Sequence, residues 1–174
     1  MPTETNQNFL ESRTFDEIHP GESASLTRTL RAEDIQLFAI ISGDINPVHI
    51  NDVVAKESIF GKRVAHGVLV SGLTSAVLGM QLPGEGTIYL GQDNKFRRPV
   101  YIGDTVKATC EVIELNTEKN IAKLATTTTN QNNEIVIEGI EDRKSMEILR
   151  EVGIWGLQGY LFKSIPFENV DSLV

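Results

Sequence analysis

The sequence contains a single cysteine, Cys110, so no disulfide can form within the chain. A chain without disulfides fits a reducing compartment, and we expect a cytoplasmic protein. Cys110 lies where apolar and polar residues alternate, which favours an inert thiol over a nucleophile. No apolar run is long enough to cross a bilayer, and the first twelve residues lack the basic-then-apolar pattern of a signal peptide. We therefore expect no membrane partner.

Basic residues are also scarce. The chain has 16 Lys and Arg against 24 Asp and Glu, which gives a formal net charge of −8. Nucleic-acid phosphates need a basic surface, so we expect no nucleic-acid partner. An anionic ligand held by a few local Lys and Arg residues remains compatible with this charge. The 174 residues, 40% of them hydrophobic, suit one domain with a real core rather than a disordered chain.

The order of periodic segments predicts an α+β architecture. Residues 24–30 alternate like a strand, residues 32–42 form a helix with acidic residues in its first turn, and residues 51–57 form a second short helix. Apolar residues cover most of the circumference of residues 67–80. We expect that segment to be a helix buried on nearly every side, with Gly72 packed closely against a sheet. Four more strands are predicted at residues 87–98, 105–115, 121–130 and 134–140. Together these segments predict a curved antiparallel sheet wrapped around one central helix.

The chemistry-bearing stretch lies between the first two predicted helices. Asp44 and His49 are five positions apart, and on a continuous helix their directions would differ by about 140°. Pro47 excludes that helix and pushes Asn46 towards an extended conformation. Gly43 is a plausible left-handed cap for the helix that ends near residue 42. The chain can therefore turn here and aim the carboxylate and the imidazole into one pocket.

The same residues also suit an ordinary Asx-Pro turn, in which Asp44 and Asn46 bond their own backbone and His49 lies on the surface. In the functional interpretation, a carboxylate and an imidazole move protons. The N-terminus of the helix that begins at Gly67 would hold an oxygen that gains negative charge. These parts suit the addition of water across a double bond conjugated to a carbonyl. Asp44 and His49 offer only two possible metal ligands, so we expect no metal.

Three motifs carry a resemblance to a known family. They are Ser-Gly-Asp-Ile-Asn-Pro-Val-His at 42–49, Ala-His-Gly-Val-Leu-Val-Ser-Gly at 65–72, and Phe-Arg-Arg-Pro-Val-Tyr-Ile-Gly-Asp-Thr-Val at 96–106. In this order they resemble the MaoC-like hot-dog family and, more narrowly, its (R)-specific enoyl-CoA hydratases. The resemblance implies a hot-dog domain at residues 9–140. It also implies a homodimer that hydrates trans-2-enoyl-CoA reversibly to (R)-3-hydroxyacyl-CoA without a cofactor.

The resemblance also implies roles for individual residues. Asp44 and His49 match the catalytic pair that holds a water and moves its protons, one of them to the α-carbon. Gly67 matches the position whose backbone N–H polarises the thioester carbonyl. The substrate-binding positions implied are Asn46, which supports the turn, Ser75 at the active site, and Leu78 along the acyl tail.

The residues themselves leave other interpretations open for several of these positions. Ser75 has the pattern of a core hydroxyl bonded to a carbonyl one turn back, and Leu78 that of ordinary core. His66 has the pattern of a structural residue that orients the loop. The basic cluster suits either CoA phosphates or a solvated strand face. That cluster consists of Lys95, Arg97 and Arg98.

The C-terminal part departs from the family pattern. Where the family continues with a strand of small and aliphatic residues, residues 140–150 are charged and have a helical pattern. The large side chains that follow favour a tail that is at least partly docked. They are Trp155, Tyr160, Phe162 and Phe167. We therefore divide off residues 141–174 as an atypical extension, partly helical and docked, and leave the acyl-chain length open.

Three other functions remain compatible with the sequence. A hot-dog dehydratase would act on an acyl carrier protein thioester instead of acyl-CoA. A thioesterase would hydrolyse the C–S bond. A non-catalytic module would bind an acyl thioester without needing the Asp44 and His49 pair.

Overall fold

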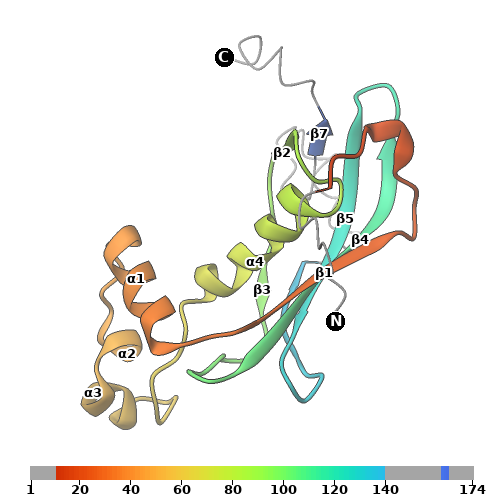
Figure 1. Ribbon diagram of the computed structural model, residues 1–174. Helices are drawn as coiled ribbons and strands as arrows, with labels where there is room; N and C mark the ends of the chain where they lie inside the picture. Colours follow the sequence, from red (N-terminus) through yellow and green to blue (C-terminus); the bar gives the residue numbers. More distant parts are fainter. Residues whose placement is uncertain (1–10, 140–161, 165–174) are drawn as a thin grey trace, which may run out of the picture.

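The computed structural model describes residues 11–139 and 162–164 (Figure 1). Within them the chain forms the 3₁₀-helix η1 (Phe15–Glu17), strand β1 (Ser23–Thr29), helices α1 (Ala32–Ser42), α2 (Pro47–Ile50), α3 (Asp52–Glu57) and α4 (Gly67–Met80), and strands β2 (Thr87–Tyr89), β3 (Lys95–Phe96), β4 (Thr105–Asn116), β5 (Ile121–Thr129), β6 (Ile135–Gly139) and β7 (Phe162–Ser164). The predicted helices 32–42 and 67–80 are confirmed with the same bounds.

One antiparallel sheet contains all seven strands of the described residues. Its main path runs β1-β4-β5-β6-β3, and the long bent strands β1, β4 and β5 run alongside α4 in Figure 1. Helix α4 contacts β1, β2 and β4. This arrangement confirms the expected curved sheet around a central helix, which is the hot-dog architecture.

The core lies between α4 and the inward face of the sheet. Because successive side chains of a strand point to opposite faces, every second residue is buried in β4 as far as Val112 and along the whole of β5. Those strands contribute Val106, Ala108, Cys110, Val112, Ala122 and Leu124, and α4 contributes Val70, Leu73, Val77 and Leu78. Burial of Cys110 raises the pKa of its thiol to about 12, so the expected inert thiol is confirmed.

The start of α1 is stabilised by one carboxylate. Asp34 accepts a hydrogen bond of 2.9 Å from the backbone N–H of Arg31, and it also pairs with the Arg28 guanidinium. These interactions, led by the backbone hydrogen bond, hold the pKa of Asp34 below its usual value. The carboxylate therefore satisfies a free N–H at the positive end of the helix, as the acidic first turn predicts.

Helix α4 is less buried than its composition predicts. Val68, Gly72, Ser75 and Gly79 are exposed, and their spacing places them along one stripe of the helix. A Cβ built on Gly72 would meet no atom within 4 Å. The predicted close packing of Gly72 against a sheet is therefore wrong, as is burial on nearly every side. Composition could not tell which side of an apolar helix the chain's own sheet covers.

The predicted strand 87–98 is interrupted. It forms β2 and β3, which pair with different partners, β7 and β6. The residues between them include Gly91, Asp93 and Asn94, types that fit poorly in a strand. Gln92 and Asn94 instead share a local side-chain hydrogen bond of 2.6 Å.

Strands β6 and β7 share one edge of β5. Gly139 of β6 lies opposite Thr126, and Phe162 of β7 lies opposite Ala122. If β6 continued unbroken along β5, the residue four positions after Gly139 would lie opposite Ala122. Phe162 lies there instead, so two separate segments of the sequence pair with the same edge of β5. Three residues of the C-terminal extension thus belong to the sheet. The predicted helix and the other aromatic residues of the extension lie outside the described residues, and the boundary at residue 140 stays a prediction.

A membrane-spanning helix would need both length and an apolar surface. Across residues 11–139 and 162–164, none of the helices combines the two to the extent that a bilayer requires.

Candidate active site

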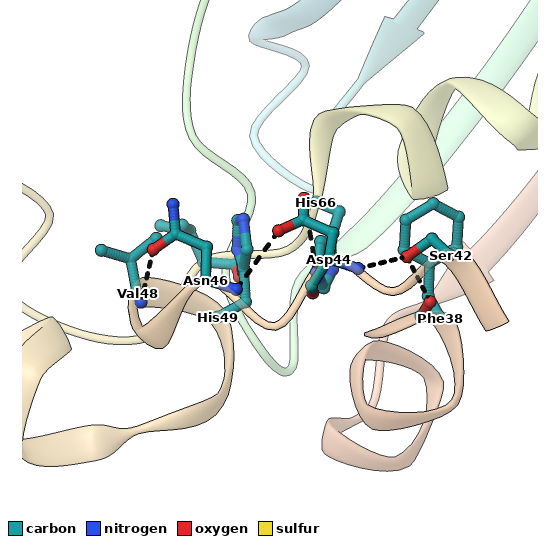
Figure 2. Close-up of polar contacts among 8 residues, drawn as sticks. Phe38, Ser42, Asp44, Asn46, Val48, His49 and His66 are labelled. Carbon is teal, nitrogen blue, oxygen red and sulfur yellow. Dashed lines mark hydrogen bonds and ion pairs between the residues drawn. The ribbon is translucent and has the colours of Figure 1, made fainter. Parts of the chain in front are cut away.

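The turn between α1 and α2 is built by hydrogen bonds to its own backbone (Figure 2). Helix α1 ends at Gly43, whose φ of 75° is the left-handed cap that the sequence predicts. The Oδ1 atom of Asp44 accepts the N–H of Asn46 at 3.2 Å, and the Oδ1 atom of Asn46 accepts the N–H of Val48 at the same distance. Asn46 is therefore the N-cap of α2, with Pro47 as its first residue.

His49 lies on α2 and is half-buried. Its Nδ1 atom lies 2.8 Å from the carbonyl oxygen of Val64. A carbonyl only accepts, so Nδ1 carries the hydrogen of this bond and Nε2 is left with a lone pair in the neutral ring. The Asx-turn interpretation is thus right about Asp44 and Asn46 and wrong in placing His49 on the surface.

The structure brings a third group to this pair. One carboxylate oxygen of Asp44 and one ring nitrogen from each of His49 and His66 all lie within 4.8 Å of one another. His66 is only 2% exposed, and its Nε2 atom lies 2.9 Å from the backbone oxygen of Asp44. The sequence predicted no metal because it offered only two ligands, and that reason is wrong, since the structure brings three together. Both imidazoles nevertheless already use one nitrogen for a backbone carbonyl, and the absence of a metal stays a prediction.

A mostly apolar cavity lies beside the imidazole of His49. Its lining consists of Asn46, Val48, His49, Phe60, Val64, Ala65, Gly67, Val68, Val70, Phe96, Arg97, Arg98, Pro99, Val100 and Ile137. Cavities of this kind, apolar with a few converging polar groups, are typical of small-molecule sites. Three of the predicted site residues, Asn46, His49 and Gly67, therefore face one space. The side chain of Asp44 is about half exposed and lies next to that space without lining it.

Gly67 places the N-terminus of α4 at this cavity. The first N–H of the helix to reach a backbone carbonyl is that of Val70, which bonds to His66. Among the residues that the structure describes, the N–H of Gly67 has no acceptor, so it can hold an oxygen of a ligand. A Cβ at this position would lie 2.6 Å from Cε1 of Phe96. Only glycine therefore fits while the Phe96 ring keeps its place.

Two predicted substrate-binding residues lie elsewhere. Ser75 is eight residues beyond Gly67, about 12 Å along the helix axis at the usual rise of 1.5 Å per residue. It belongs to the exposed stripe of α4, so the expected core hydroxyl is wrong. Leu78 is 1% exposed, belongs to the core cluster and does not line the cavity. The geometry therefore does not bring Ser75 and Leu78 to the group around His49.

The basic cluster is divided between the cavity and the exposed surface. Arg97 and Arg98 line the cavity, whereas Lys95 is exposed and does not. Arg97 Nε donates to Glu138 at 2.7 Å, and Arg98 lies 3.6 Å from Glu134. Both guanidinium groups remain about half exposed, so they can also meet an anionic part of a ligand.

Residues 17–134 match the family model described as MaoC like domain. An (R)-specific enoyl-CoA hydratase of Rhodospirillum rubrum is 49% identical over 125 residues, 72% of this chain and 86% of the relative. A mitochondrial 3-hydroxyacyl-[acyl-carrier-protein] dehydratase of Arabidopsis thaliana is 35% identical over 67% of this chain and 70% of the relative.

The solved structures agree with the sequence relatives. The unliganded R-hydratase PhaJ1 of Pseudomonas aeruginosa superposes with a TM-score of 0.70 at 42% identity. The match covers 74% of this chain and 82% of the PhaJ1 chain. Since the family model spans more than half of the 174 residues, the chain belongs to the MaoC-like dehydratase family.

Proposed function

We propose that this protein is an (R)-specific enoyl-CoA hydratase, a hydro-lyase that adds water reversibly to trans-2-enoyl-CoA. The observation that carries the proposal is the grouping of Asp44 and His49 within 4.8 Å, beside a cavity that Gly67 at the N-terminus of α4 also lines. Relatives at 40–49% identity with the same name support the substrate and the product, (R)-3-hydroxyacyl-CoA.

The geometry suggests how the reaction proceeds. The thioester oxygen accepts the N–H of Gly67, and the positive end of the α4 dipole favours the negative charge that develops there. A water lies between Asp44 and His49, and Nε2 of His49 takes one of its protons. The water oxygen bonds to the β-carbon while the π electrons move to the thioester oxygen as an enolate. The enolate then takes a proton from the pair at its α-carbon, and the C=O bond forms again.

Coenzyme A is the carrier that the cavity favours. Arg97 and Arg98 bring two guanidinium groups to its lining, and such groups bind phosphates well. A dehydratase acting on a carrier protein remains the second candidate because one relative carries that name. We keep Ser75 and Leu78 as proposed substrate contacts from the resemblance, and the cytoplasmic location as a proposal from the single cysteine.

A thioester assay tests the activity against its alternatives. We expect crotonyl-CoA to lose its enone absorbance without release of free thiol, and faster than crotonyl-loaded acyl carrier protein at equal concentration. Thiol release would indicate a thioesterase, and no change in either signal would indicate a binding module. Cys110 is fully buried, so we expect the folded chain to add little background to the thiol reading.

Replacing either member of the catalytic pair should abolish hydration. Asp44→Asn keeps the Oδ1 atom that accepts the Asn46 N–H, and His49→Asn keeps an amide donor near the position of Nδ1. We expect kcat to fall by about a thousandfold in each, within the range typical for a lost acid or base, with an unchanged melting temperature. His19→Gln, at an exposed histidine outside the site, is the matched control and should keep full activity. Near-normal rates in either site variant would rule out the assigned roles.

Gly67→Ala should obstruct the proposed oxyanion position. The added methyl lies where the Phe96 ring packs, so this ring, which lines the cavity, must shift. We expect kcat/KM for crotonyl-CoA to fall by about tenfold or more, since small displacements of reacting groups are costly. In a Phe96→Ala background the same substitution should cost much less, because the clash is gone. Equal losses with and without Phe96 would contradict this account.

The exposed surface supports a homodimer. The stripe of α4 is uncovered in the single chain, and so are Leu37, Ile40 and Ile41 of α1. Apolar surface of this kind is unfavourable in water and is typical of an interface. We expect light scattering to give twice the chain mass of 19.2 kDa, and Gly72→Arg to shift it towards one chain. The control Glu118→Arg, in an exposed turn, should leave the mass unchanged. A single-chain mass for the unaltered protein would contradict the dimer.

A further inference from the structure

His66 is the residue immediately before α4, and it is almost completely buried. Its carbonyl oxygen accepts the N–H of Val70 and so closes the first turn of the helix. That carbonyl belongs to the same peptide unit as the N–H of Gly67. Contacts that hold His66 in place therefore also hold the N–H of Gly67, the proposed oxyanion donor.

The side chain of His66 reaches back to the turn that carries Asp44 (Figure 2). Its Nε2 atom lies 2.9 Å from the backbone oxygen of Asp44. Since a carbonyl accepts only, Nε2 carries the hydrogen. Nδ1 is buried and has no hydrogen-bond partner in the described structure, which suits a nitrogen without a hydrogen. These two observations assign one tautomer to the ring.

The ring of His66 also packs against the second catalytic side chain. Its centroid lies 3.8 Å from that of His49, with an angle of 30° between the planes. On another side the ring of Phe38 from α1 lies 4.9 Å away and is tilted by 54°. One buried imidazole thus contacts α1, the turn, α2 and the beginning of α4.

We propose that His66 is a positioning residue, whose Nε2–H holds the carbonyl of Asp44 and thereby fixes the Asp44 and His49 pair against the N-terminus of α4. The inference deepens the proposed hydration activity and rests on it. His66 takes no proton from the substrate in this role. It sets the distance between the proton-transfer pair and the oxyanion donor, which must act on adjacent atoms of one substrate.

Two substitutions separate the hydrogen bond from the ring contact. His66→Gln places an amide donor near the position of Nε2 and loses the ring. His66→Phe keeps an aromatic ring between His49 and Phe38 and loses the donor. We expect His66→Phe to lower kcat by about tenfold or more with KM changed by less than about twofold, and His66→Gln to stay within about threefold of the unaltered enzyme.

The outcomes of these measurements differ in a way that a structural role alone would not produce. Rescue by His66→Gln with loss in His66→Phe, at comparable melting temperatures, supports the positioning hydrogen bond. Equal losses in both variants would overturn it and leave only packing. Full activity of His66→Phe would overturn it as well.

A measurement without substrate keeps the inference testable if a variant fails to fold or the unaltered protein proves inactive. The chain has three histidines, so long-range ¹H–¹⁵N spectra of the imidazoles can be assigned with His19→Gln as a reference. We expect the hydrogen of His66 on Nε2 and that of His49 on Nδ1. A hydrogen on Nδ1 of His66 would overturn the inference. The expected tautomers in a protein that does not hydrate crotonyl-CoA would overturn the proposed function and leave the hydrogen bond in place.

Discussion

The site depends on a series of local hydrogen bonds between α1 and α2, in which side-chain oxygens accept backbone N–H groups. Ser42, Asp44 and Asn46 each accept a backbone N–H two residues further along the chain. A single bond of this type contributes about 0.5–1.5 kcal/mol, so no one of them fixes the turn alone. Acting in sequence, and closed by Pro47, they leave the chain few other conformations. The direction of His49 follows from that restriction.

Two interpretations of this turn that looked exclusive are compatible with each other. One Asp44 oxygen caps the backbone, as in any Asx turn, while the carboxylate still lies within reach of both imidazoles. The structural hydrogen bond orients the carboxylate that the proposed chemistry needs. A polar residue bonded to its own backbone is therefore not excluded from catalysis, since a carboxylate has lone pairs for both tasks.

The features that could be predicted from the sequence are those that depend on residues close together in the chain. Gly43, Pro47 and the apolar run at 67–80 determine local conformation, and the cap and helix boundaries match. The exposed side of α4, the interruption after Tyr89 and the contact of His66 with Asp44 were not predictable in the same way. Each depends on which segment lies opposite, and residues 22 positions apart leave no periodic signal. His66 beside Gly67 was the only local hint.

The split at the edge of β5 has a consequence for how this chain can vary. β6 and β7 both pair with β5, β6 up to Gly139 and β7 from Phe162. The neighbouring strand is likewise divided into β2 and β3. Strands that are far apart in the sequence thus pair with the same edge of β5. Because β6 and β7 each pair with β5 through their own residues, the β5–β6 register is set independently of the number of residues between Gly139 and Phe162.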